Sequence, residues 1–263
     1  MVVEYVARDW NDLMDQLFDG SWREDLGRYR SSFVYRGLPD ARWDLRPSLS
    51  RPERDYTKVE THLLRAFKKY AKRDAVSEDT IWNLLAVAQH HGLPTRLLDW
   101  TYSPLVALHF ATDNVAKFGQ DGAVWCVNVE RTNQDLPHPL QALLRKEGSM
   151  VFTVEMLARA ASTLEEFGTL SESDFVVFFE PPSLDARMVN QYALLSLMST
   201  PTGCLGMWLH QRPEQYKKII IPAHLKLEVR DRLDQANITE RVLFPGLDGL
   251  SRWLARYYGP LTR

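Results

Sequence analysis

The amino-acid sequence predicts an α+β domain in which mixed, mainly antiparallel strands are flanked by helices. Short apolar runs that end at glycine or proline predict the strands, and they do not alternate regularly with helices as they do in doubly wound folds. Segments with apolar residues at helical spacing predict the flanking helices. The chain has 263 residues and is 45% hydrophobic, which is enough apolar material for a well-buried core.

The strand predictions rest on β-branched and aromatic runs bounded by turn-forming residues. The run GLPTRLLDW begins with loop signals and continues as an extended segment. The other predicted strands are residues 33–37, 123–129, 175–182, 191–198 and 216–222.

The helix predictions rest on amphipathic spacing and on helix-start signals. Ser103 is a plausible N-cap and Pro104 suits the first helical position, so a helix begins there. The predicted helices are residues 9–19, 56–72, 78–91, 103–113, 223–238 and 246–259.

We expect the chain to consist of an N-terminal lead-in and one main domain that contains an insertion. Residues 1–29 form an N-terminal helical lead-in, and residues 30–263 form the main domain. Residues 137–172 are mostly helical and weakly patterned, which predicts a helical insertion within that domain.

Composition limits the cellular setting and the partners. Acidic residues (34) and basic residues (32) nearly cancel, so nucleic-acid binding would need a local patch such as the basic segment 67–73. Cys126 and Cys204 have no Cys or His at metal-ligand spacing, which predicts neither a metal site nor a disulfide framework. The N-terminus lacks a signal-peptide pattern, and no apolar run approaches membrane-spanning length. We therefore expect a cytoplasmic protein without a membrane partner.

Arg36 lies in the middle of an otherwise apolar predicted strand. Burying an unpaired charge is strongly unfavourable, so Arg36 must have an anionic partner or face a cleft. A guanidinium suits bidentate binding of phosphate, and Gly37 lets a ligand or another backbone approach closely. A structural salt bridge, for instance to Asp99, is an equally weighted alternative.

The segment QHHGLPTRLLDWT (89–101) has the highest density of polar and aromatic residues that could bind a ligand or take part in catalysis. His90 or His91 could take part in acid–base chemistry, and Trp100 could stack on a base or a nicotinamide ring. Arg96 and Asp99 could pair with each other or with Arg36. The structural alternative is that the histidines end a helix and that Trp100 belongs to the core.

These residues resemble the FRG domain. FVYRG (33–37) resembles the sequence that names this domain, WDLRPSLSR (43–51) resembles its continuation, and residues 89–111 resemble its second block. Weaker similarity continues at RMVNQY (187–192) and in residues 237–249. Such a long ordered pattern is more specific than one short motif.

The resemblance implies a layout similar to that of ADP-ribosyltransferases, with NAD as the substrate. Arg36 and Gly37 fit the first strand, where the arginine holds the NAD phosphates. Thr101 fits the hydroxyl position that precedes the helix with PLVALHFA (104–111). On this layout Arg96, Asp99, Trp100 and His91 belong to the NAD-binding segment, and His90 approaches the nicotinamide end.

The resemblance also implies a final strand with a catalytic glutamate, which stabilises an oxocarbenium-like transition state. Here Gln191 stands at that position, and a neutral amide supplies no negative charge. Glu240 is the nearest alternative carboxylate, although the sequence favours an exposed strand residue there.

Three functions follow as expectations. The first is a mono-ADP-ribosyltransferase that modifies a macromolecular acceptor, either protein or nucleic acid, as a bacterial toxin or phage-defence effector with an antitoxin partner. The second is a non-catalytic module that binds a nucleotide or nucleic acid. The third is a scaffold in which Arg36, Arg96 and Asp99 form a closed internal ion-pair network.

Overall fold

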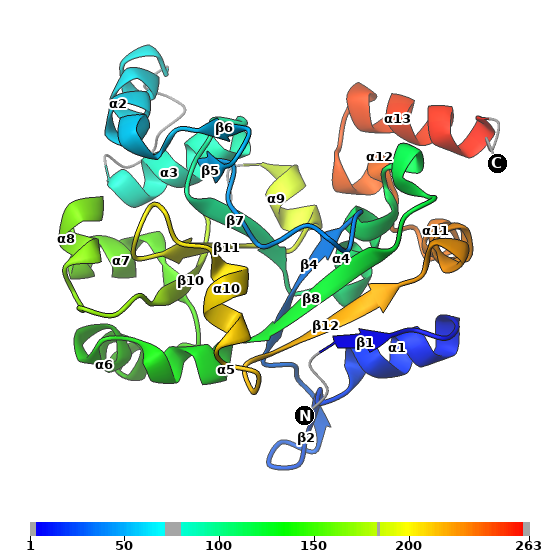
Figure 1. Cartoon of the computed structure of the whole chain (residues 1–263), viewed down its shortest axis with the longest axis horizontal. Helices are drawn as coiled ribbons and strands as arrows, with labels where there is room; N and C mark the ends of the chain where they lie inside the picture. Colours follow the sequence, from blue (N-terminus) through cyan, green and yellow to red (C-terminus); the bar gives the residue numbers. More distant parts are fainter. Residues whose placement is uncertain (1–3, 72–79, 183–184, 260–263) are drawn as a thin grey trace.

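The computed structural model describes residues 4–71, 80–182 and 185–259 (Figure 1). A central sheet in these ranges has the strand order β1–β12–β8–β4–β7–β11–β10–β9. Neighbouring strands from β12 to β10 are antiparallel, whereas β1–β12 and β10–β9 are parallel. The predicted α+β class with mainly antiparallel strands is therefore confirmed. The bounds are β1 Glu4–Val6, β12 Tyr216–Ile221, β8 Gly122–Asn128, β4 Phe33–Leu38, β7 Leu97–Thr101, β11 Ala193–Met198, β10 Val176–Glu180 and β9 Phe152–Thr153.

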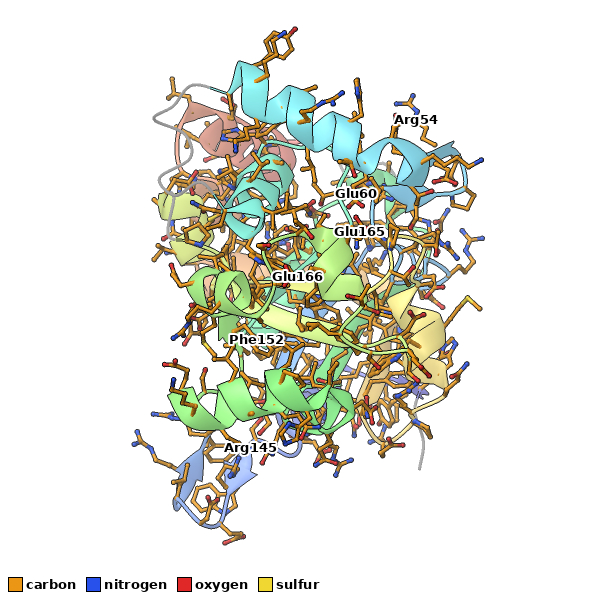
Figure 2. All side chains as sticks on the ribbon, turned by 90° about the vertical axis from the view of Figure 1, so that its left-hand side faces the viewer. Arg54, Glu60, Arg145, Phe152, Glu165 and Glu166 are labelled. Carbon is orange, nitrogen blue, oxygen red and sulfur yellow. The ribbon has the colours of Figure 1, made fainter. Side chains whose placement is uncertain are left out.

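The side chains of alternate strand residues point to opposite faces of the sheet. On one face, helices α1, α4 and α11 cover β4, β8 and β12, while α2, α3, α6, α7 and α8 cover the half formed by β7, β11, β10 and β9. In Figure 2 the helices that cover β7, β11, β10 and β9 face the viewer. Glu60 of α2 lies above, Glu165 of α8 lies in the middle and Arg145 of α6 lies below. These helices are α1 Trp10–Phe18, α2 Glu60–Tyr70, α3 Ile81–His90, α4 Pro104–Thr112, α6 His138–Glu147, α7 Val154–Ala160, α8 Leu164–Gly168 and α11 Lys226–Gln235.

The opposite face of the sheet packs against a shorter covering layer. Leu205 and Trp208 of α10 and Leu45 of the segment after β4 join alternate residues of the strands in one apolar cluster. The described part of the chain also contains further helices and two two-stranded ribbons. They are α5 Val129–Thr132, α9 Ala186–Asn190, α10 Leu205–His210, α12 Glu240–Leu243, α13 Leu247–Tyr258, the ribbon β2 Trp22–Arg23 with β3 Arg28–Tyr29, and the ribbon β5 Ser50–Arg51 with β6 Arg54–Asp55.

Most predicted elements are confirmed within one to four residues of their ends. The helix expected from residue 103 begins at Pro104, and the Ser103 side chain accepts a hydrogen bond from the backbone N–H of Val106, as a cap residue should. Of the other expected segments, residues 72–73 of the basic patch and residues 78–79 lie outside the described residues. The structure adds β1, which the sequence did not indicate, at one edge of the sheet.

One strand prediction was wrong at its start. The strand expected over 191–198 begins at Ala193, because Gln191 caps α9 and Tyr192 takes a positive φ of 51° that turns the chain. Gln191 therefore lies in the turn before the strand rather than in it.

The segment expected as a helical insertion contains α6, α7 and α8 together with β9, which pairs with β10. The N-terminal segment contributes β1 to the main sheet. The domain limits at residues 30, 137 and 172 stay predictions. No helix in the described ranges is long and apolar enough to cross a membrane.

Gly37 fixes how closely α4 approaches β4. A Cβ atom at this position would lie 1.8 Å from the backbone oxygen of Ala107 and 2.7 Å from the backbone nitrogen of Ala111. Real atoms cannot approach so closely, so any side chain would push α4 away from the strand. The close approach that the sequence predicted at Gly37 is thus made by another backbone.

We predict that Gly37→Ala lowers the free energy of unfolding by about 3 kcal/mol or more, because the added methyl group meets backbone that cannot rotate away. Urea denaturation measures this change. Gly119→Ala is the matched control, since a Cβ there meets nothing within 4 Å, and it should change stability by less than about 1 kcal/mol. Equal effects of the two substitutions would contradict the packing account.

Candidate functional site

A cavity of about 300 Å³ opens between β4 and β7. We call it the Arg36 cavity. It is lined by Tyr35, Arg36, Gly37, Leu38, Pro39, Trp43, Arg51, Asp99, Trp100, Thr101, Phe110, Asp113, Arg187, Gln191 and Ala193. Six of these residues were predicted as site residues, and they come from three separate segments of the sequence: Arg36, Gly37, Asp99, Trp100, Thr101 and Gln191.

The cavity forms because two neighbouring strands diverge. β4 pairs with β8 along its whole length, from Phe33 to Leu38, but among the described residues it pairs with β7 only through Tyr35 and Thr101. Beyond that pair the Arg36 side chain spans the gap, and its Nη1 donates a hydrogen bond of 2.5 Å to the backbone oxygen of Asp99. A guanidinium thus takes the place of a strand-to-strand backbone bond.

Arg36 keeps unused hydrogen-bonding capacity. Its side chain is 18% exposed, and its Nε is buried without a partner among the described residues. The Asp99 carboxylate lies 3.9 Å from Nη1, at the limit of an ion pair, and is itself 63% exposed. Burial lowers the pKa of Arg36, and the nearby Arg51 adds to this, whereas Asp99 opposes it. An arginine still carries its proton at neutral pH, so the cavity holds an incompletely paired cation.

Two further arginines that were not predicted as site residues line the same cavity. Arg51 stands on β5 and is exposed, and Arg187 stands on α9 with its guanidinium 4.9 Å from the ring centre of Phe244. Both lie in segments that resemble the FRG domain. The presence of an arginine in each of these segments could have predicted them as site residues. Three arginines line the cavity against two acidic residues, Asp99 and Asp113, and this excess of positive charge favours an anionic ligand.

Thr101 and Gln191 lie in the cavity wall, where backbone groups engage their side chains. The Thr101 hydroxyl donates to the backbone oxygen of Gln191 at 2.7 Å and accepts from the backbone N–H of Ser103 at 3.0 Å. The Gln191 amide donates to the backbone oxygen of Leu243 at 3.0 Å. Both residues therefore position β7, α9 and α12 relative to one another.

Trp100 is a core residue, as the structural alternative proposed. Its side chain is almost fully buried, its indole N–H donates to the Ser196 hydroxyl at 2.8 Å, and its ring meets Phe178 edge-on. Such a ring cannot stack on a ligand. Trp43, which is 46% exposed and lines the cavity, is the aromatic residue better placed for that contact.

His90 and His91 do not line the Arg36 cavity. The Nε2 atom of His90 lies 2.8 Å from the carboxylate of Asp185, and that carboxylate also caps the start of α9. His91 caps the end of α3 and is exposed. His90 therefore connects α3 to the helix that carries Arg187. In the described ranges, no group of three or more His, Cys, Asp or Glu residues is placed to hold a metal ion.

Arg96 is a structural residue, so the expectation that it pairs with Asp99 or Arg36 was wrong. Its guanidinium binds both carboxylate oxygens of Glu60, with Nε 2.7 Å from Oε1, and both side chains are only 6% exposed. The pair fastens α2 to the start of β7, because a buried charge needs a fully bonded partner. The closed network of Arg36, Arg96 and Asp99 that a scaffold would require is not formed.

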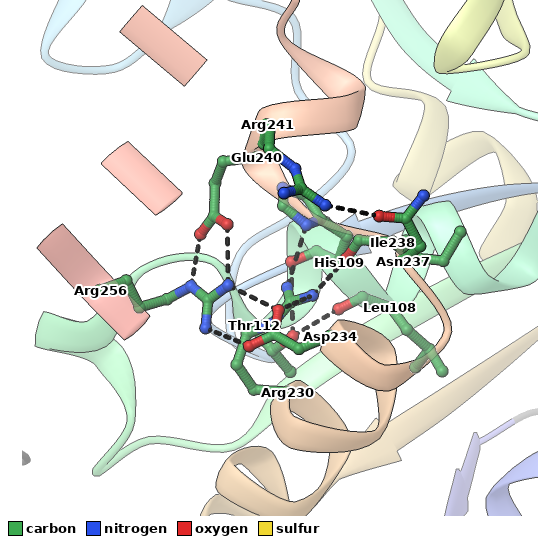
Figure 3. A network of polar contacts seen from close by, with 10 residues as sticks. All are labelled: Leu108, His109, Thr112, Arg230, Asp234, Asn237, Ile238, Glu240, Arg241 and Arg256. Atoms are coloured by element: carbon green, nitrogen blue, oxygen red, sulfur yellow. Dashed lines mark hydrogen bonds and ion pairs between the residues drawn. The ribbon is translucent and has the colours of Figure 1, made fainter. Parts of the chain in front are cut away.

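Glu240 is also a structural residue, and its assignment to an exposed strand was wrong. It begins helix α12 and is only 6% exposed (Figure 3). Arg256 of α13 binds its carboxylate at 2.5 and 2.8 Å and also binds Asp234 of α11 at 2.7 and 2.8 Å. Burial is the largest single influence and would raise the pKa of Glu240, but the hydrogen bonds and charge of Arg256, together with a hydrogen bond from the backbone N–H of Glu240 itself, lower it.

His109 lies beneath this network and is fully buried (Figure 3). Arg230 donates a hydrogen bond of 3.0 Å to its Nδ1, so the neutral ring carries its proton on Nε2, which has no partner among the described residues. Burial, assisted by the charge of Arg230, lowers the pKa of His109 to about 3. The imidazole is therefore neutral at every physiological pH.

Comparison with known families identifies one part of the chain. The family model of the FRG domain matches residues 31–120. The resemblance to the FRG domain is confirmed. This FRG segment contains Arg36, Gly37, Arg51, Asp99 and Thr101, whereas the residues that close the cavity from the other side, Arg187 and Gln191, lie beyond it. No curated protein and no solved structure matches the chain.

Two groups near the end of the FRG segment, the buried His109 and the partly buried Asp113, should give opposite pH effects on stability. Unfolded His109 gains a proton near pH 6.5, but the folded state does so only near 3, so its contribution to stability falls as pH drops from about 6.5. Burial, helped by the nearby Glu240, raises the pKa of Asp113 from 3.8 to about 6. The folded state then holds this proton more tightly, and the contribution of Asp113 rises as pH drops from about 6.

We predict that urea denaturation between about pH 7 and pH 5 separates the two groups. His109→Gln, which can still accept the bond from Arg230, should lose less stability on acidification than the wild type. Asp113→Asn should lose more. Parallel pH profiles for the wild type and both variants would show that neither group is buried as described.

Proposed function

We propose that the protein binds a phosphorylated nucleotide in the Arg36 cavity. The observation that carries this proposal is the Arg36 guanidinium, which is held rigidly by the Asp99 carbonyl while its Nε has no partner among the described residues. A buried donor without a partner costs free energy, and the guanidinium, which is 18% exposed, can offset this cost through a charge-assisted hydrogen bond from its Nη atoms to a phosphate oxygen. Arg51 and Arg187, which line the same cavity, add positive charge for such a ligand.

The rest of the lining suits the organic part of a nucleotide. Trp43 and Phe110 supply aromatic surface, and Leu38 and Pro39 supply apolar surface. A volume of about 300 Å³ is at the lower end for ligand sites, so the cavity suits a mononucleotide or one half of a dinucleotide such as NAD. Arg36 would hold phosphate at its inner end.

Mono-ADP-ribosyl transfer from NAD is the second candidate function. It is favoured because Arg36, Thr101 and Gln191, three positions expected from the transferase-like layout, line the same cavity. In this reaction the bond from the ribose C1′ to nicotinamide breaks, nicotinamide leaves, and a nucleophile of a protein or nucleic-acid acceptor bonds to C1′ and loses its proton. The roles of toxin or phage-defence effector, and an antitoxin partner, rest on the family resemblance alone.

The expected catalytic carboxylate is the weak point of this second function. Gln191 is neutral and bonded to α12, and Glu240 is bonded to Arg256. A negative charge beside the sugar has to come from another residue of the cavity if the protein is a transferase. Nucleotide binding requires no such residue, and for this reason it stands first.

We predict that calorimetric titration detects binding of NAD, ADP-ribose or ATP and that Arg36→Met weakens it by about 10- to 100-fold, the value of one lost charge-assisted hydrogen bond. Arg145→Met is the matched control, because this exposed arginine of α6 lies outside the cavity. It should leave affinity unchanged.

Release of nicotinamide from NAD separates the two candidate functions. Release by the wild type but not by Arg36→Met would support transferase chemistry, and binding without release would support the binding module. The proposal fails if none of the three nucleotides binds, or if Arg36→Met binds them as tightly as the wild type.

A further inference from the structure

Asp113 belongs to two cavities at once. It lines the Arg36 cavity, and it also lines a cavity of about 840 Å³ bounded by the segment after α4 and by α11, α12 and α13. The aromatic rings of Phe110 and Phe244, 6.1 Å apart, stand beside it where the two cavities meet. Asp113 is thus a lining residue that the two cavities share.

Arginines occupy both sides of this junction. Arg187 lines the Arg36 cavity, and its guanidinium carbon lies 4.9 Å from the ring centre of Phe244. Arg252, from the larger cavity, lies 4.4 Å from the same ring centre. Phe244 therefore interacts with a cation from each cavity. Asp113 lines both cavities as well.

The carboxylate of Asp113 differs from those of Glu240 and Asp234 in having no side-chain partner among the described residues; its own backbone N–H is the donor that acts on it. Glu240 and Asp234 in the larger cavity are saturated by Arg256, at 2.5 to 2.8 Å. Among the described residues, no side chain or backbone group of another residue donates a hydrogen bond to Asp113. Arg230 and Arg252 are close enough to act on its charge, but neither bonds to it.

A partly buried carboxylate without a side-chain partner, next to several arginines, restricts which part of a ligand it can contact. It repels phosphate, which Arg36, Arg51 and Arg187 attract. It attracts O–H donors, and its two oxygens can accept hydrogen bonds from two neighbouring hydroxyl groups of a sugar. Because the pKa of Asp113 is about 6, raised mainly by burial, most of the carboxyl is ionised at pH 7 and acts as an acceptor.

We infer that Asp113 recognises the 2′- and 3′-hydroxyl groups of a ribonucleotide whose phosphate lies on Arg36. The inference rests on the proposed nucleotide binding and adds a substrate class, because it makes the site selective for ribose over deoxyribose. The sugar then lies at the junction of the cavities, and the remainder of a larger ligand extends toward α13.

The test compares ADP with 2′,3′-dideoxy-ADP by calorimetric titration. The wild type should bind ADP at least about tenfold more tightly, which is the value of hydrogen bonds to a charged acceptor. Asp113→Asn keeps the size of the side chain but removes its charge. It should weaken ADP binding but not dideoxy-ADP binding, so that the ratio of the two affinities falls several-fold.

Two control variants separate the role of Asp113 from other effects. Asp231→Asn alters an exposed carboxylate of the larger cavity and should keep the wild-type ratio. Arg36→Met should weaken both ligands equally and also keep the ratio. The thermal unfolding midpoint of each variant verifies that it is folded.

The outcomes are distinct for the two proposals. Equal binding of ADP and dideoxy-ADP by the wild type, or an unchanged ratio in Asp113→Asn, overturns the role of Asp113 and leaves nucleotide binding intact. Absence of binding of both ligands by the wild type overturns the proposed function and this inference together. The wild-type ratio decides the question even if Asp113→Asn does not fold.

Discussion

The hydrogen bond from Arg36 Nη1 to the backbone oxygen of Asp99 is the interaction on which the site depends. It spans the place where β4 and β7 separate, and it holds a guanidinium at the inner end of the resulting cavity. An arginine in an apolar strand is costly to bury, and this cost is only partly offset by one carbonyl and a distant carboxylate. The free energy left uncompensated at Arg36 is what a phosphate ligand would recover.

The surroundings of Arg36 keep this arrangement rigid. Gly37 seats β4 directly on α4, and the Arg96–Glu60 pair fastens the start of β7 to α2. Thr101 and Gln191 use their side chains to bind backbone groups across β7, α9 and α12. These residues are thus committed to structure, and the arginines that line the cavity are left to bind phosphate.

The C-terminal segment completes the site, although it lies outside the FRG segment. Asn190 and Gln191 donate to the backbone oxygens of Val242 and Leu243, and Arg256 connects α13 to α11 and α12 (Figure 3). This connection places Phe244 and Arg252 beside Asp113. The FRG segment therefore supplies Arg36, Arg51 and Asp113, and the rest of the chain supplies Arg187, Phe244 and Arg252 around them.

The sequence predicted the α+β class, most elements and the position of Arg36 beside a cleft, because apolar periodicity and the cost of a buried charge are local properties. It did not predict the partners of Arg96 and Glu240, since Glu60 and Arg256 reach them only through tertiary packing. Asp113 was missed for the same reason. Nothing in the sequence distinguishes a carboxylate without a side-chain partner from one that is saturated by an arginine.

A crystal structure of the protein with bound ADP-ribose tests the central claim most directly. We predict a phosphate oxygen about 3 Å from Arg36 Nε or from a free Nη atom, with Arg51 and Arg187 nearby and the sugar toward Asp113. Density for the ligand elsewhere on the protein, with the Arg36 cavity filled only by solvent, would contradict it.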